Sequence, residues 1–105
     1  MPDAWTACIE KLQRGEAVKL RPHGGSMTPI IKSGQLVTLE PSPGLDGLAV
    51  GDVVLAKVRG KVRLHKISAI NHITGLVEIS NNKGRINGWC GGRSDVYGIM
   101  TKVEP

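Results

Sequence analysis

The sequence predicts a mainly β protein, built as a small coiled sheet or partial barrel with one short helix at its N-terminal end. The chain has no Phe, one Tyr and two Trp, so its core must come from Val, Ile and Leu, a mixture that favours strands. Short apolar runs also alternate with Gly, Pro and Asn turn signals about every ten residues, a spacing typical of small β folds.

The length of 105 residues leaves room for one domain with a modest core. We therefore expect a single domain over residues 1–105, with a helical segment at 1–15 followed by a β domain at 16–105.

The first segment has the pattern of an amphipathic helix over about residues 3–14. Apolar side chains recur at helical spacing from Trp5 to Leu12, as they do on the buried face of a helix. Pro2 and Asp3 suit a first turn and Gly15 suits a helix end.

The rest of the chain predicts strands separated by loops. Residues 17–20 and 36–39 are expected strands, and two β-branched runs flanking Arg59-Gly60 predict a hairpin. The Pro/Gly-rich segment 42–47 is expected as a loop. Residues 75–80 predict a further strand, 81–95 a Gly/Asn-rich loop, and 96–105 a last strand.

Charge makes nucleic acid an unlikely partner, although a basic accessory protein stays a third alternative. The net charge is +5, but Lys and Arg are spread from Lys11 to Lys102 without a dense run, as on an ordinary solvated surface. Aromatic residues are too few for a base-stacking platform. Steep salt dependence of binding would mark the nucleic-acid alternative.

Cys8 and Cys90 form no CxxC pair and stand near no ligand-spaced His cluster, so we expect no metal, no cofactor and no disulfide framework. No apolar stretch approaches the roughly 20 residues of a membrane span, and the N-terminus lacks a signal-peptide core. The expected location is the cytoplasm.

Ser26 and His65 are the candidate catalytic pair. Ser26 follows Gly24-Gly25, whose small residues let a substrate approach and expose backbone N–H groups, and Pro29 stiffens the next part of the segment. His65 lies within a predicted strand, and an imidazole is a competent general base near neutral pH. Lys66 is the alternative base, but it needs burial to lower its pKa.

The segment GGSMTPIIKSGQLVTLEP followed by GDVVLAKVRGKVRLHKISAI resembles the nucleophile and base boxes of the S24/S26 peptidase superfamily, which includes signal peptidases and LexA-type repressors. The resemblance runs from about residue 17 to the C-terminus. Leu64-His65-Lys66 is similar to the His-type members, so the resemblance implies Ser26 as nucleophile, His65 as base and the signal-peptidase/LexA type of fold.

A Ser26/His65 dyad suggests roles for the neighbouring residues. Backbone amides around Gly25 and Ser26 would bind the oxyanion, and Met27 and Ile30 would wall a substrate subsite, although core packing is the favoured role for Met27. An extended peptide beside a sheet edge is the implied substrate.

The orienting group for His65 departs from the family pattern. His-type members carry an Asp nearby, whereas this chain has Ile79-Ser80-Asn81-Asn82-Lys83 there. Asn82 can hold an imidazole but brings no full charge, and Asp95 is the next downstream carboxylate. Both stay open as orienting residues.

Two functions are the leading hypotheses. The first is a stand-alone bacterial or phage serine peptidase with a Ser26/His65 dyad, its oligomeric state undetermined by sequence. The second is a catalytically idle member of the same fold that binds or regulates a host partner, which the missing acid favours.

Overall fold

Helix α1 covers Ala4–Gln13 in the computed structural model, which describes residues 4–105. Leu12 is 3% exposed and joins the buried cluster under β1 and β2, and Gly15 takes a φ of +86° just after the helix. The predicted amphipathic helix is confirmed over this range, while Pro2 and Asp3 lie outside the described residues.

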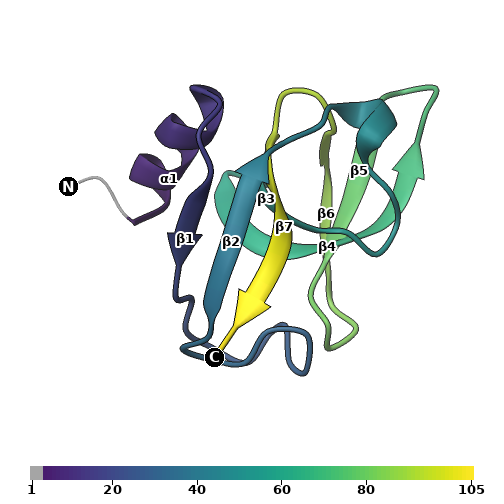
Figure 1. The fold of residues 1–105 in the computed structure, drawn as a ribbon. Coiled ribbons are helices and arrows are strands. Elements are labelled where there is room, and N and C mark those ends of the chain that lie inside the picture. The colour runs from purple at the N-terminus through teal and green to yellow at the C-terminus, as the bar shows by residue number, and fades with distance from the viewer. Residues whose placement is uncertain (1–3) are drawn as a thin grey trace.

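Seven antiparallel strands form one open sheet in the order β1-β2-β7-β3-β4-β5-β6 (Figure 1). The prediction of a mainly β fold with a short N-terminal helix is confirmed. The strands are β1 Val18–Leu20, β2 Leu36–Pro41, β3 Val53–Val58, β4 Lys61–Asn71, β5 Leu76–Ser80, β6 Ile86–Gly91 and β7 Val96–Glu104. A short 3₁₀ helix, Leu45–Gly47, lies within the predicted Pro/Gly loop.

Strand β6 corrects the prediction of a continuous loop over residues 81–95. Turns occupy only the ends of that segment, and Ile86–Gly91 pairs along β5. Asn and Gly have low intrinsic strand preference, but pairing with a neighbouring strand decides strand formation more strongly than propensity does.

The predicted β3–β4 hairpin is confirmed. Arg59 and Gly60 both have positive φ, at 49° and 78°, as the two central residues of a type I′ turn require. The turn brings Val58 opposite Lys61, and the pairing continues to Val53 opposite Lys66.

Two buried clusters cover the opposite faces of β3, because successive side chains of a strand point to opposite faces. Val54, fully buried, belongs to one cluster with Ile67 and Ile79, and Leu55, equally buried, belongs to the other with Leu39. Strands β3 and β4 therefore connect the two halves of the core.

The sheet curves so that β6 returns over the hairpin. A Cβ built on Gly88 would lie 3.0 Å from Arg59 Nε and 3.3 Å from Val58 Cγ2, although β6 does not pair with β3. The loops that follow β1 and β5 lie at one end of the sheet (Figure 1). Within residues 4–105 no helix is long and apolar enough to cross a bilayer.

Candidate active site

The loop over residues 21–35, here named the nucleophile loop after its candidate residue Ser26, is fixed by apolar anchors. Met27 and Ile31 are each 4% exposed, and the Ile31 N–H donates to the Met27 carbonyl at 2.9 Å. The Gly34 N–H donates to the Pro22 carbonyl at 2.9 Å and closes the base of the loop. Ser26 therefore stands exposed beside a buried support.

Ser26 and His65 meet within hydrogen-bond distance. Ser26 Oγ lies 3.1 Å from His65 Nε2, although 39 residues separate them in the sequence. His65 is 7% exposed and is held on β4 opposite Val54. This separation is the contact that a serine nucleophile and its base need.

Asn87 of β6 is the residue that orients His65. Its Oδ1 lies 2.6 Å from His65 Nδ1, so it accepts the Nδ1–H of the neutral ring. That tautomer leaves the lone pair of Nε2 free to accept the Ser26 hydroxyl proton. Ser26, His65 and Asn87 thus form a chain of hydrogen bonds of the kind that triads use.

A β-bulge places Asn87 in this position. Ile79 lies opposite Gly88 and Ser80 lies opposite Ile86, so Asn87 is the extra residue on β6. Bulges re-aim side chains and recur beside active sites. Gly88 has a φ of +135°, a backbone conformation that L side chains rarely adopt.

The two orienting residues proposed from sequence have other partners. Asp95 Oδ2 accepts the Gly91 N–H at 2.8 Å and so closes the turn before β7. Asn82 contacts the nucleophile loop and Lys66 instead of His65. Asn87 was missed because it lies in the segment predicted as a loop, where neither strand β6 nor its bulge was expected. Its position in the Asn- and Gly-rich segment was the only sequence signal.

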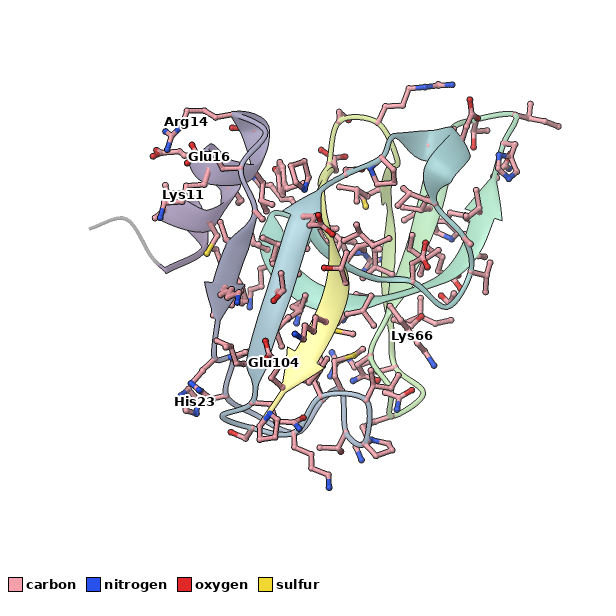
Figure 2. All side chains as sticks on the ribbon, viewed as in Figure 1. Lys11, Arg14, Glu16, His23, Lys66 and Glu104 are labelled. Atoms are coloured by element: carbon pink, nitrogen blue, oxygen red, sulfur yellow. The ribbon has the colours of Figure 1, made fainter. Side chains whose placement is uncertain are left out.

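Asn82 fastens the nucleophile loop to the sheet. Its backbone N–H donates to the Ser26 carbonyl at 2.8 Å, and its Nδ2 donates to the Thr28 carbonyl at 2.9 Å. Lys66 Nζ donates to Asn82 Oδ1 at 3.1 Å, so Lys66 is occupied here and the structure gives it no contact with Ser26 Oγ. Figure 2 shows the Lys66 side chain projecting outward from β4.

His65 has a pKa below its ordinary value of 6.5. Burial is the main cause, because a charged imidazolium loses hydration there, and the nearby positive charge of Arg63 acts in the same direction. The hydrogen bond to Asn87 opposes both by favouring the charged form. At neutral pH the ring is therefore uncharged, as a general base must be.

Backbone N–H groups are available beside the nucleophile. Over the described range, residues 4–105, the N–H groups of Gly25 and Ser26 donate to no protein acceptor. Both residues are exposed. Backbone N–H groups beside a serine are the donors that an oxyanion needs. The amides of Gly25 and Ser26, which the sequence suggested for this role, are therefore available for it.

A cavity of about 180 Å³ opens at Ser26 and His65. That volume is below the roughly 300 Å³ at which sites for whole small ligands begin, so it suits one side chain of a longer molecule. Met27 belongs both to the core and to the cavity wall. The wall contains Ile31, whereas the expected wall residue Ile30 does not line the cavity and is 39% exposed.

The cysteines are free thiols. Burial, with a smaller effect of the Asp95 carboxylate, raises the pKa of Cys90 to about 11, so it is protonated at neutral pH and a poor nucleophile. Among residues 4–105 no group of three or more His, Cys, Asp or Glu side chains is arranged to hold a metal ion.

No protein-family model matches this chain, and no curated protein sequence matches it either.

Proposed function

We propose that the protein is a serine peptidase in which Ser26 is the nucleophile, His65 the general base and Asn87 the residue that positions the base. The observation that carries the proposal is the continuous contact from Ser26 Oγ to His65 Nε2 at 3.1 Å and from His65 Nδ1 to Asn87 Oδ1 at 2.6 Å. A hydroxyl, a neutral imidazole and an acceptor in this order have the arrangement of acyl-transfer sites.

The reaction would proceed in two halves. Ser26 Oγ attacks the peptide carbonyl carbon while His65 Nε2 takes its proton, and the oxyanion lies against the N–H groups of Gly25 and Ser26. The imidazolium then protonates the leaving amine, and an ester to Ser26 remains. Water attacks this ester, His65 again takes and returns a proton, and the carboxylic acid leaves with Ser26 restored.

An extended peptide fits the edge of β4 next to Ser26. In the hairpin, Val58 and Lys61 close the turn, so the backbone N–H and C=O groups of Val62 and Leu64 point away from β3. Pairing with β5 begins only at Lys66. This leaves an open strand edge in the cavity wall, where a substrate strand can add.

The resemblance of the Ser26 and His65 segments to the S24/S26 superfamily supports the same proposal. The proposal includes a coiled sheet or partial barrel of the signal-peptidase/LexA type as the fold, and a bacterial or phage-infected cytoplasm as the place where the protein acts. The residue hydrogen-bonded to His65 Nδ1 is an amide, Asn87, and not a carboxylate. This predicts a slower enzyme, because Asn87 cannot stabilise the imidazolium with a full charge.

The test is cleavage of a diverse peptide library, mapped by mass spectrometry, with wild-type protein beside Ser26→Ala at equal concentration. We expect wild type to cut a consistent motif. Ser26→Ala should lose at least about 1000-fold in rate, as removal of a triad nucleophile does.

A matched control is Ser33→Ala, which changes another serine of the same loop, one whose Oγ accepts the Gly24 N–H at 3.1 Å. This variant should keep most of the activity. Equal and negligible product from wild type and Ser26→Ala over long incubation would overturn the peptidase proposal and favour a binding module.

A further inference from the structure

A second hollow lies next to the Ser26 cavity, between α1 and the β3–β4 hairpin. Its volume is about 450 Å³. Trp5 of α1 and Val62 of β4 stand in the walls of both hollows, so the two meet at these side chains. We call the second hollow the hairpin groove. Its walls include Trp5, Ile9, Lys57, Lys61, Val62 and Tyr97.

Cations line both hollows. Lys57 and Lys61 stand in the hairpin groove, and Arg63 stands in the cavity wall. The charge of Arg63 reaches the site, since it helps to lower the pKa of His65. In the part of the chain that the structure describes, no Asp or Glu lines either hollow.

Two described carboxylates near these elements, Asp95 and Glu16, have partners outside the groove. Asp95 is close enough to Tyr97 to raise its pKa, after the larger effect of burial, but it accepts the Gly91 N–H and does not line the groove. Glu16, just after α1, pairs with Arg14 at 2.8 Å. Figure 2 shows this pair at the end of the helix, pointing away from the sheet.

The hairpin groove is also amphipathic. Trp5, Ile9 and Val62 supply apolar wall in the groove, and Trp5 and Val62 also line the Ser26 cavity. A chain lying along the open edge of β4 would pass from the cavity over Val62 to Lys61. An acidic side chain at that point would meet cations beside apolar surface, where ion pairs are less screened than in open water.

We propose that the substrate is an extended peptide with acidic side chains on one side of the scissile bond, in the part that crosses the hairpin groove. This inference rests on the proposed peptidase function. Lys57 and Lys61 bind the carboxylates, and Trp5 and Val62 pack on the apolar side chains between them and the cut. The charge preference is thus expected on the side of the scissile bond that crosses the hairpin groove, where Lys57 and Lys61 stand.

The experiment uses one cleaved library peptide made in three forms, with Glu, Gln or Lys at the positions that cross the groove. The rates kcat/KM are compared for wild type and Lys57→Gln/Lys61→Gln. The control is Lys19→Gln/Lys102→Gln, which removes the same charge from exposed residues that line neither hollow. Binding of the same fluorescent peptides is measured on Ser26→Ala.

We expect wild type to prefer Glu over Gln by about 3- to 10-fold, since exposed ion pairs contribute about 0.2–1 kcal/mol each. Lys57→Gln/Lys61→Gln should lose this preference and the control should keep it. The preference should also shrink as salt rises.

The failures are distinguishable. Cleavage with no preference for Glu, or a preference lost equally in both double variants, overturns the acidic-substrate inference and leaves the peptidase standing. If Ser26→Ala cuts the peptides as fast as wild type while Lys57→Gln/Lys61→Gln alone loses the preference for Glu, the groove's charge selectivity is supported and the peptidase proposal with Ser26 as nucleophile fails.

Discussion

The protonation of His65, the proposed base, is set by opposing contacts. Burial and Arg63 lower its pKa, and the acceptor Asn87 raises it. Only the neutral ring takes a proton from Ser26, so on the acid side kcat/KM should fall as His65 becomes protonated. For wild type we expect this fall at a pH below the ordinary His value of 6.5.

Two substitutions at Asn87 should move the acid limb, which is this fall of kcat/KM at low pH, in opposite directions. Asn87→Ala removes the contact that favours the charged ring, so the pKa falls further and the limb moves to lower pH. Its kcat should also drop about 10- to 100-fold, part of what a positioned base contributes. Asn87→Asp adds a negative charge, so the limb should move to higher pH.

The pH profile of kcat/KM for the three proteins checks this expectation. Asn81→Ala is a suitable control, because Asn81 Oδ1 accepts the Lys83 and Arg85 N–H groups in a turn and does not touch His65. Limbs that move together, or that stay fixed in both Asn87 variants, would show that Asn87 does not tune the base.

The same residues show how far sequence reasoning reaches at this scale. Ser26 and His65 stood out because each lies in a local pattern, a Gly-Gly-Ser turn and an alternating strand. Asn87 is defined by a bulge, which depends on how β6 pairs with β5. Asp95 was a reasonable candidate by charge alone, but its carboxylate is needed at the Gly91 turn.

At the scale of elements, the proposed active site is a junction between two loops and two strands, with Ser26 on the loop between β1 and β2. Strand β4 supplies His65 and Lys66, β6 supplies Asn87, and the loop after β5 supplies Asn82. The helix, the hairpin and most strand positions could be predicted from periodicity and turn residues. Strand β6 could not, because its pairing with β5 outweighs the weak strand preference of Asn and Gly.

Asn82 acts as a positioning residue for the nucleophile loop. Asn82→Ala removes the contacts to the Thr28 carbonyl and to Lys66 Nζ while the backbone bond to Ser26 stays. We expect about 1–2 kcal/mol of lost stability, from two hydrogen bonds of about 1 kcal/mol each. A drop of about 10-fold in kcat should accompany it, because small misplacements of reacting groups are costly.

Chemical denaturation and steady-state kinetics on the same samples separate the two effects. Asn81→Ala should lose comparable stability from its turn contacts and keep its kcat. If Asn82→Ala keeps its kcat, with only its stability reduced, Asn82 has a purely structural role.

At the scale of the whole molecule, the two core clusters are expected to unfold together. Neighbouring residues of β3 serve different clusters, Val54 on one face and Leu55 on the other. Loss of either cluster would expose one face of the same strand. A small domain connected in this way should be two-state.

Leu39→Ala and Ile79→Ala test this coupling, because each fully buried residue belongs to a different cluster. Each should lower the free energy of unfolding by about 2–5 kcal/mol through lost burial and the cavity left behind. Trp5 packs on one cluster, and Trp89 lies on β6, which contributes Cys90 to the other. The Trp5→Phe background leaves Trp89 to report on the cluster that contains Ile79, and the Trp89→Phe background leaves Trp5 to report on the cluster that contains Leu39.

Both probes should report one transition at the same denaturant concentration in each core variant, and activity should disappear with it. The Trp→Phe backgrounds without a core substitution give the reference midpoints. If Ile79→Ala shifts the Trp89 transition alone, the half that holds Asn87 opens independently of the half that holds Ser26. The active site would then be lost before the protein unfolds, since its hydrogen-bonded chain joins residues from both halves.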